Sequence, residues 1–458
     1  MKHIGKFKIS GLLGKGGMGK VFKVEYPVTG KIGALKLLAP EPLLITLMGD
    51  KAVEDLFVSE AITMASIRHP HVVEILDFDW FEERPYYIMA FYCNNLGTLM
   101  GESYATEHPS RIIGLEKSIR YTKQLLDGLA CLHHRSVIHR DIKPYNILID
   151  DLDNVKICDF GLSKLRNETF RGHKSLKVGT PYYAPPEQEE DPDGVDETAD
   201  LYSVGVMLFR MLTGRLPEKK LIASDLNPDL DTEWDDFFHK ALSPKPGRRY
   251  ADADAMAEDL DRLGQAWTRK KESICLAPPE WFNEPDPQET VPDIRRTPQK
   301  VYKSQARDHF ALDELMRPQR LLTNQFEPWS DTLLLDRTTR LIWERSGTRF
   351  PINWKEAQAH VRQLNQARFQ GLDHWRMPTV DELLTLFTPP PQGMGHCLEP
   401  VFDTRQHWLW SADRASFTAA WYASLALGFV AANDFSSFYH LKAVCTAPDD
   451  LTPPLPLS

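Results

Sequence analysis

The segment VIHRDIKPYNILID, from Val137 to Asp150, constrains the fold most, because it places charged and polar side chains between two apolar runs. These side chains belong to His139, Arg140, Asp141, Lys143 and Asn146. A polar turn between strands is the commoner origin of such a pattern, since Asp, Asn and Pro satisfy backbone groups locally in turns. The alternative is a catalytic loop, which would need residues elsewhere in the chain to supply what this loop lacks.

Length and charge bound the kind of protein. The chain has 458 residues, a formal net charge of -10 and a pI near 5.9, so we expect two or three domains. No basic excess favours nucleic-acid binding, and the six cysteines lack a CxxC pair or zinc spacing and should be free thiols. The first residues contain no apolar signal region, and no run approaches the roughly 18 apolar residues that span a bilayer. We therefore expect a cytoplasmic protein that has no membrane span and binds no nucleic acid.

A change in composition divides the chain. Residues 1–267 alternate strand-like and helix-like patterns and close on an amphipathic helix. Residues 268–325 are rich in Pro, charged and polar residues without periodicity, which predicts an extended linker. Alternating patterns resume over 326–447 and predict a second domain, whereas the Pro-rich tail 448–458 should fray.

A glycine-rich segment, ISGLLGKGGMGKVFKVEY, places Gly14, Gly16 and Gly19 in a G-x-G-x-x-G pattern. A dinucleotide-binding fingerprint would open a helix, but Val21 begins a β-branched and aromatic run that continues as a strand. A phosphate-binding P-loop needs Gly-Lys-Ser/Thr, and no lysine here precedes a hydroxyl residue. The pattern therefore predicts a glycine flap between two strands, whose bare backbone can lie close to the phosphates of a nucleotide.

Two charged residues follow the flap in apolar surroundings. Lys36 stands inside the strand-like run KIGALKLLA, where a lone ammonium is costly unless it meets an anion. Surface snorkelling is the alternative. Glu60 falls on a predicted helix with Phe57 and Met64 on its inner face, and it could reach Lys36. The pair would hold Lys36 on phosphate oxygens.

These residues resemble the eukaryotic-type protein kinase family, specifically its bacterial Ser/Thr branch, over residues 1 to about 265. The flap matches G-x-G-x-x-G-x-V as far as Val21, and the run from Ala34 to Lys36 stands where the family has V-A-I-K. The resemblance implies a two-lobed fold, with an N-lobe of about residues 1–92 and a C-lobe of about 93–267.

The resemblance also implies a nucleotide-binding hinge in YYIMAFY, between the two lobes. Met89 stands at the position of the gatekeeper. Backbone groups from Ala90 to Tyr92 would hold the adenine of ATP. Because these contacts come from the main chain, the replacement of a commonly acidic residue by Ala90 should matter little.

The opening segment now has partners, since HRDIKPYN matches the family's catalytic loop and KICDFGLSK supplies the D-F-G signature at Asp159. The resemblance implies that Asp141 accepts the substrate hydroxyl proton and that Lys143 offsets charge on the transferred phosphoryl group. Asn146 and Asp159 would hold Mg²⁺, or alternatively Mn²⁺, which bridges the ATP phosphates. Lys143 at this position resembles the Ser/Thr rather than the Tyr branch, and His139 should pack rather than act as a base.

Other matches are structural. Glu187, in PPE, should pair with Arg249 and anchor the substrate platform, and Asp200 should steady the backbone of the catalytic loop. Pro185 departs from the family's A-P-E and removes one backbone N–H. Kinases with an arginine at the position of Arg140 often need a phosphate on the activation segment.

The activation segment offers several hydroxyl residues for such a phosphate. They are Ser163, Thr169, Ser175 and Thr180. Thr180 should face the catalytic residues as part of the substrate platform, which leaves Thr169 or Ser175 as the expected phosphosite. Plain solvated hydroxyls are the alternative.

The second domain resembles the Lcl-type C-terminal domain, a bacterial module of C-type-lectin-like fold. The resemblance rests mainly on W-R-x-P-T-x-x-E-L, which begins at Trp375, and the usual Arg-Cys-Val-Arg ending is absent near Cys445. Thr379 and Glu382 predict a helix-capping box. The loops from about 404 to 440 are rich in Tyr, Phe, Ser and Asn, which favours recognition of a protein or small ligand. C-type-lectin-like domains of this kind also occur as hypervariable products of diversity-generating retroelements, so by analogy of fold these loops could be diversified in the same way.

The sequence thus predicts an α+β protein with a two-lobed kinase fold, a linker and a small C-type-lectin-like domain. The predicted function is transfer of the γ-phosphoryl group of Mg-ATP to protein Ser/Thr hydroxyls, autophosphorylation included, in signal transduction, with the C-terminal domain as a sensor. One alternative is a catalytically weak kinase-fold scaffold whose C-terminal domain binds a target. Another makes the C-terminal domain an enzyme, by analogy with formylglycine-generating enzymes, but no reactive Cys arrangement supports it.

Overall fold

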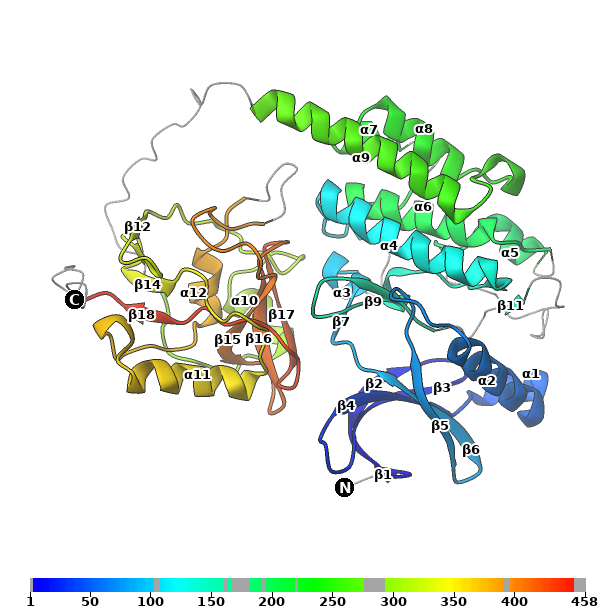
Figure 1. The fold of residues 1–458 in the computed structure, drawn as a ribbon, viewed down its shortest axis with the longest axis horizontal. Helices are drawn as coiled ribbons and strands as arrows, with labels where there is room; N and C mark the ends of the chain where they lie inside the picture. The colour runs from blue at the N-terminus through cyan, green and yellow to red at the C-terminus, as the bar shows by residue number, and fades with distance from the viewer. Residues whose placement is uncertain are drawn as a thin grey trace. The chain divides into compact units, whose positions relative to one another are not determined.

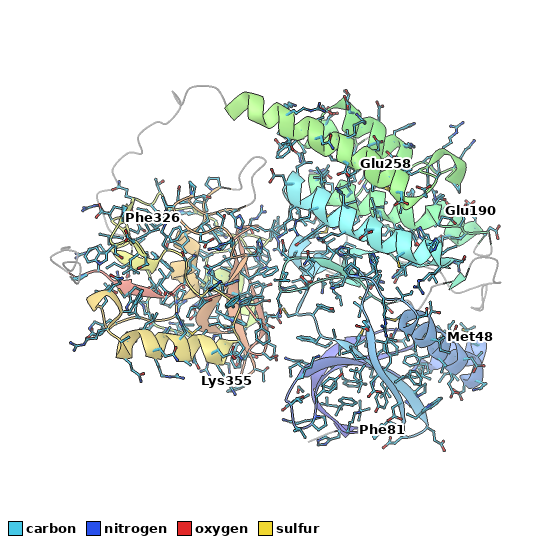
Figure 2. All side chains as sticks on the ribbon, in the orientation of Figure 1. Met48, Phe81, Glu190, Glu258, Phe326 and Lys355 are labelled. Atoms are coloured by element: carbon cyan, nitrogen blue, oxygen red, sulfur yellow. The ribbon has the colours of Figure 1, made fainter. Side chains whose placement is uncertain are left out.

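The computed structural model divides the chain into two compact units, Met1–Ser273 and Ile274–Ser458 (Figure 1). The described residues are 3–102, 108–159, 164–165, 182–191, 194–218, 221–275, 293–389 and 396–448. Each unit buries apolar clusters of its own, as expected of separate domains. Figure 2 shows the side chains on the ribbon, with Phe81 in the first unit and Lys355 in the second.

The first lobe of unit 1 is a six-stranded antiparallel sheet in the order β1-β2-β3-β4-β6-β5. Its strands are β1 (His3–Ile4), β2 (Phe7–Lys15), β3 (Gly19–Glu25), β4 (Ile32–Leu38), β5 (Ile75–Phe81) and β6 (Arg84–Ala90). Two helices, α1 (Pro42–Met48) and α2 (Asp50–Ala65), follow β4. α2 contacts β5 and β6 and buries Phe57 and Met64 on its inner face, so this helix can bring a side chain to the sheet.

The second lobe of unit 1 is mainly helical (Figure 1). Its elements are β7 (Asn94–Asn95), α3 (Leu96–Met100), α4 (Leu115–His134), β8 (Val137–Ile138), β9 (Ile147–Ile149), β10 (Val155–Ile157), β11 (Lys164–Leu165), α5 (Pro186–Glu190), α6 (Thr198–Thr213), α7 (Ala223–Leu226), α8 (Thr232–Ala241) and α9 (Ala253–Cys275). α6 is apolar on nearly every side and lies buried against α4 and α8, and it ends at Gly214, whose φ of 72° suits glycine. Among the described residues, no helix combines the length and the apolar character that crossing a bilayer requires.

Unit 2 contains two antiparallel sheets and short helices. The strands and helices are α10 (Ala306–His309), β12 (Phe326–Pro328), β13 (Leu333–Asp336), β14 (Leu341–Glu344), α11 (Trp354–Gln366), α12 (Val380–Thr385), β15 (Trp408–Arg414), β16 (Ala419–Ser424), β17 (Phe429–Asp434) and β18 (Val444–Thr446). One sheet has the order β12-β13-β14-β18 and the other β15-β16-β17. Trp343, Leu383, Trp421 and Val444 come from both sheets and α12 and share one buried cluster.

The capping box at the start of α12 is present. The Glu382 amide donates to Thr379 Oγ1 at 3.2 Å, and the Thr379 amide donates to Glu382 Oε2 at 2.9 Å. Arg376 forms an ion pair with the other carboxylate oxygen of Glu382. Three residues of the W-R-x-P-T-x-x-E-L motif therefore serve to begin a helix.

The structure corrects the expected linker, 268–325. α9 continues to Cys275, and residues 293–325 pack in unit 2. Val301 and Phe310 lie in the core of unit 2, and Trp421 Nε1 donates to the carbonyl oxygen of Val301 at 2.9 Å. These apolar residues are too widely spaced to show a helical or strand period, which explains why the second domain was expected to begin only at residue 326. Residues 276–292 lie outside the described part of the chain.

The cysteines whose side chains are described form no disulfide with one another. They are Cys93, Cys131, Cys158, Cys397 and Cys445. Burial raises the pKa of Cys397 to about 11 and that of Cys445 to about 12, so both stay protonated at neutral pH.

Candidate active site

The glycine-rich segment connects β2 to β3. The Gly16 amide donates to the carbonyl oxygen of Gly19 at 2.9 Å, and Gly14 lies opposite Val21 in the sheet. A Cβ atom on Gly19 would lie 2.4 Å from the carbonyl oxygen of Leu37, so only glycine fits there. The segment is therefore a tight link between strands.

Lys36 lies at the centre of a charged cluster in which Lys36 and Glu60 are buried and Asp159 is exposed to solvent. Its Nζ atom is 2.7 Å from Glu60 Oε1 and 3.0 Å from Asp159 Oδ1. β4 supplies Lys36, α2 supplies Glu60, and Asp159 follows Cys158 after β10. The structure thus brings together three residues that are widely separated in the sequence.

The charges of this cluster set its protonation. Burial lowers the pKa of Lys36, but the carboxylates of Asp159 and Glu60 outweigh burial and raise this pKa well above its usual value. The same ammonium lowers the pKa of Asp159 to about 2. Burial raises the pKa of Glu60 in spite of Lys36. At neutral pH the cluster therefore holds a cationic Lys36 and an ionised Asp159.

The expected hinge residues lie at the end of β6 and directly after it. Met89 pairs with Ala34 of β4, and Ala90 pairs with Gly33. Met89 and Ala34 are buried, whereas Ala90 and Tyr92 are partly exposed where the chain leaves the sheet. The backbone from Ala90 to Tyr92 thus lies at the edge of the first lobe, immediately before β7.

The catalytic-loop residues form a second polar cluster. Asp141 Oδ2 accepts hydrogen bonds from Lys143 Nζ at 2.7 Å and from Asn146 Nδ2 at 3.0 Å. Asn146 Nδ2 also donates to the carbonyl oxygen of Asp141 at 2.8 Å. The Cys158 amide donates to the carbonyl oxygen of Asn146 at 3.0 Å, which connects this loop to the residue before Asp159. The arrangement fixes one carboxylate oxygen of Asp141 with two donors.

Asp200 on α6 accepts hydrogen bonds from the backbone of this loop. Its Oδ1 accepts the amide hydrogen of Arg140 at 2.8 Å, and its Oδ2 accepts that of His139 at 2.9 Å. Arg140 has a φ of 69°, which is unfavourable for a residue with a side chain. The Asp200 carboxylate holds this conformation, and His139 is fully buried beside it.

A bidentate ion pair lies farther along the second lobe. Arg249 donates through its two terminal nitrogens to Glu187, at 2.6 and 2.8 Å. Arg249 Nε also donates to the carbonyl oxygen of Ser243 at 2.7 Å. The pair therefore connects α5 to the segment before α9.

Several expected residues lie outside the described part of the chain. They are Phe160, Gly161, Ser163, Thr169, Ser175 and Thr180.

The sequence reasoning missed two polar residues of this region. The hydroxyl of Tyr87, on β6, donates to Glu60 Oε1 at 3.0 Å, and Gln188 Nε2 donates to the carbonyl oxygen of Arg140 at 2.7 Å. Tyr87 stands two residues before Met89, so strand alternation places it on the sheet face of Lys36. The alternation can be read from the sequence, but the pairing of β6 with β4 cannot, and nothing local indicates the partner of Gln188.

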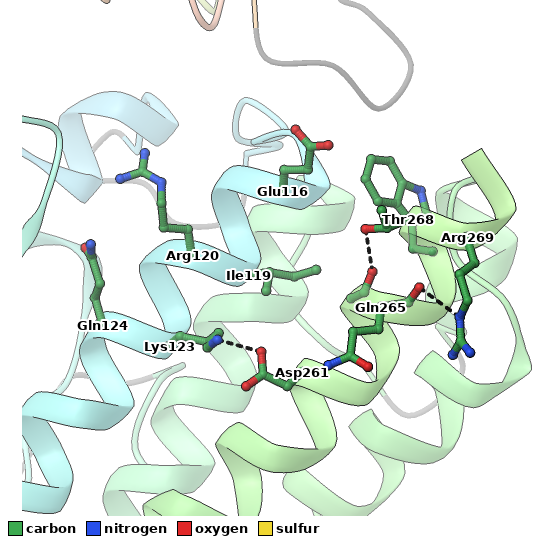
Figure 3. Close-up of a pocket in the computed structure, with 11 residues that line it drawn as sticks. Glu116, Ile119, Arg120, Lys123, Gln124, Asp261, Gln265, Thr268 and Arg269 are labelled. Carbon is green, nitrogen blue, oxygen red and sulfur yellow. Dashed lines mark hydrogen bonds and ion pairs between the residues drawn. The ribbon is translucent and has the colours of Figure 1, made fainter. Parts of the chain in front are cut away.

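A surface groove lies apart from these clusters, between α4 and α9 (Figure 3). It is lined by Glu116, Ile119, Arg120, Lys123, Gln124, Asp261, Gly264, Gln265, Trp267, Thr268 and Arg269. Lys123 and Asp261 close it with an ion pair of 2.5 Å. None of the expected site residues lines this groove, so it adds nothing to the clusters above.

Comparison with known families agrees with this geometry. Residues 7–258 match the protein kinase domain model, and residues 332–445 match the Lcl C-terminal domain model. Because the first match covers more than half of the chain, the protein belongs to the protein kinase family, and its C-terminal part carries a strand-rich Lcl C-terminal domain.

Curated relatives from bacteria and from a plant are named as Ser/Thr protein kinases. Serine/threonine-protein kinase pkn3 of Myxococcus xanthus is 30% identical over 298 residues, covering 60% of this chain and 52% of that protein. Probable serine/threonine-protein kinase PknB of Lactococcus lactis is 27% identical over 281 residues, and Serine/threonine-protein kinase PrkC of Bacillus subtilis is 28% identical over 282 residues. These matches cover 57% of this chain in both cases, and 43% and 42% of the relatives. The chain thus spans about half the length of the curated relatives, or less.

Proposed function

We propose that the protein is an ATP-dependent protein-serine/threonine kinase that phosphorylates Ser and Thr hydroxyls of protein substrates and of itself. One observation carries the proposal: the buried Lys36 Nζ lies within 3.0 Å of both the buried Glu60 and the solvent-accessible Asp159, in a cluster that joins the two lobes. A buried lysine held between carboxylates is a fixed positive charge that can bind phosphate oxygens. The names of the bacterial relatives agree with this activity.

The donor set fits the divalent cation that the family uses. Asp159 offers an ionised carboxylate, because its pKa is lowered to about 2. Asn146 directs its amide nitrogen to Asp141, so its side-chain oxygen remains for a cation. Oxygen ligands of this kind suit Mg²⁺, and Mn²⁺ as an alternative. The cation would neutralise negative charge on the ATP phosphates.

The side chains of the chain itself supply the remaining chemistry. Asp141 would accept the proton of the substrate hydroxyl on its carboxylate, which Asn146 orients. Lys143 lies 2.7 Å from Asp141 and would offset negative charge on the transferred phosphoryl group. Lys36 would hold the non-transferred phosphates in place.

Other residues would bind the nucleotide and support the loop. Gly14, Gly16 and Gly19 would place their backbone over the phosphates. Val21, Ala34 and Met89 would contact the adenine ring. The backbone from Ala90 to Tyr92 would form hydrogen bonds with the polar edge of the adenine. The positions of these residues in β2, β3, β4 and β6, and in the segments that follow β2 and β6, support these roles. Asp200, Glu187 and Arg249 would be structural supports.

Phosphorylation of the activation segment would regulate the kinase through Arg140. This arginine is almost fully buried beside the catalytic loop. A phosphate adds charge and strong acceptors that arginine binds well. We propose Thr169 or Ser175 as the phosphosite and Thr180 as part of the substrate platform.

We propose that the C-terminal domain has a C-type-lectin-like fold and binds a protein or small ligand through its loops between about 404 and 440. Its two antiparallel sheets provide a rigid scaffold, and loops on such a scaffold commonly carry recognition. Phe417 and Phe438 in this region are exposed, which supports a contact surface.

The test is phosphate transfer from labelled ATP with magnesium. Wild type should autophosphorylate, and Asp141→Asn should reduce the rate by a factor of about 100 or more, because the proton acceptor is lost. Asp127→Asn, on α4 with a side chain that is 62% exposed, is the matched control and should retain the rate. A wild type that binds nucleotide but transfers no phosphate would favour the scaffold alternative instead.

A further inference from the structure

Tyr87 lies in the middle of β6, opposite Lys36 on β4 and Phe78 on β5. Residues that face each other on neighbouring strands project from the same side of a sheet, so Tyr87 and Lys36 share the side that α2 covers. The Tyr87 ring lies 5.3 Å from that of Phe57 on α2, and Lys36 Nζ lies 5.7 Å from the centre of the Tyr87 ring. Tyr87 is 1% exposed. The ring is therefore packed between the helix and the ammonium.

The hydroxyl of Tyr87 completes the surroundings of Glu60. It donates to Glu60 Oε1 at 3.0 Å, and Lys36 Nζ reaches the same oxygen at 2.7 Å. The other oxygen, Oε2, is buried and accepts no hydrogen bond in the described part of the chain. A buried carboxylate is stable only where donors replace its lost water, so each donor on Oε1 matters.

We propose that Tyr87 is a positioning residue for nucleotide binding, whose hydroxyl fixes Glu60 and thereby holds Lys36 ready for the phosphates. The inference rests on the proposed kinase function. Lys36 has two competing carboxylates, Glu60 at 2.7 Å and Asp159 at 3.0 Å. Without the hydroxyl, Glu60 keeps a single donor on Oε1, and Lys36 shifts toward Asp159.

The consequence is a specific loss of nucleotide affinity. A Lys36 ammonium that is already in position costs less to order when the nucleotide binds. Lys36 would contact phosphates that are not transferred, so its interaction would be equally strong in the bound substrate and in the transition state. Loss of such an interaction raises KM and leaves kcat nearly unchanged. Tyr87→Phe should therefore raise KM for ATP about tenfold, the size expected from one hydrogen bond to a charged group, and change kcat by less than about twofold.

Tyr86 offers a matched control in the same strand. It is also 1% exposed, but strand alternation directs it to the opposite side of the sheet. Its hydroxyl lies 3.4 Å from Asp79 Oδ2 and, within the described part of the chain, forms no hydrogen bond with the Lys36 cluster. Tyr86→Phe should leave KM for ATP unchanged, measured on the full chain below the melting temperature of every variant.

A double-mutant cycle separates positioning from a general effect on packing. Glu60→Gln removes the charge through which Tyr87 is inferred to act, so Tyr87→Phe should add less than about a twofold change in that background. The inference is overturned if Tyr87→Phe leaves KM for ATP unchanged, if Tyr86→Phe raises it equally, or if the full effect persists beside Glu60→Gln.

A binding measurement distinguishes this inference from the proposed function. Calorimetry gives Kd for Mg-ATP on wild type and on the same variants. If wild type binds nucleotide but transfers no phosphate, the kinase proposal fails while the ratio of Kd values still decides the role of Tyr87. If wild type binds no nucleotide, both proposals fail.

Discussion

Replacing Asp200 by asparagine tests how the catalytic loop is held. The Asp200 carboxylate accepts the amide hydrogens of Arg140 and His139 at 2.8 and 2.9 Å, and it lies 2.9 Å from His133 Nε2. Asp200 is 1% exposed, so water cannot replace a lost partner. In Asp200→Asn an NH₂ group must face one of these donors, and the remaining oxygen carries no charge.

The magnitude follows from these contacts. A hydrogen bond to an ionised group contributes about 1.5–3 kcal/mol, and the left-handed conformation of Arg140 costs about 1–3 kcal/mol unless it is held. Some contacts survive in the variant, so the free energy of unfolding should fall by about 2–4 kcal/mol. The loop that carries Asp141 should relax, and kcat should fall about 10- to 100-fold.

The pH dependence of stability gives a second reading of the same contact. Burial raises the pKa of Asp200, but hydrogen bonds from His133 and His139 outweigh burial and lower it below the usual value. Such a carboxylate stabilises the fold above the pKa of the unfolded chain, near 3.9, and this contribution is lost as pH falls through the folded pKa. Asp200→Asn should therefore weaken the acid-dependent loss of stability.

The assay compares kcat and chemical denaturation with a second buried aspartate. Asp153 is also 1% exposed and bonds Tyr121 and Lys117, between β9 and β10. Asp153→Asn should lose a similar stability but keep its kcat at a temperature where both variants are folded. Equal kcat values for the two variants would refute the argument that Asp200 positions the catalytic loop.

Two further substitutions test buried ion pairs, one in each unit. Glu187→Gln leaves the guanidinium of Arg249 buried without its carboxylate and should destabilise unit 1 by about 3–5 kcal/mol in denaturant titration, whereas Glu190→Gln, on the surface of α5, should not. Arg295→Ala leaves fully buried Asp413 without its arginine and should lower the melting transition of unit 2, whereas Arg296→Ala, with only hydrogen bonds of 3.3 and 3.4 Å, should have little effect. A normal transition in either buried-pair variant would contradict this reasoning.

The charged residues of the candidate site can be picked out from the sequence, because charged side chains are conspicuous within apolar strands. Lys36 lies within an apolar run and must find an anion, and the structure provides Glu60 and Asp159. Tyr87 and Gln188 could not be found in this way. A tyrosine in a strand is an ordinary core residue, and only the tertiary position of α2 gives its hydroxyl a carboxylate.

The boundary of the second domain was missed for a related reason. The segment from 293 to 325 contains few apolar residues, and Val301 and Phe310 are too far apart to show a period. In the sequence, Arg295 looks like one of the charged residues of a linker. In the structure, both of its terminal nitrogens donate to Asp413 on β15, more than a hundred residues away. Long-range contacts of this kind determine which side of a boundary a polar segment joins.

The motifs of the two units therefore carry different information about function. In unit 1 the matched polar residues Lys36, Asp141 and Asp159 lie in clusters whose charges exceed what folding alone requires. In unit 2 the matched residues Arg376, Thr379 and Glu382 bond to one another and to the first turn of α12, which is a structural role. The motif match there identifies the scaffold, and the loops between about 404 and 440 that we propose as the binding surface lie outside the motif.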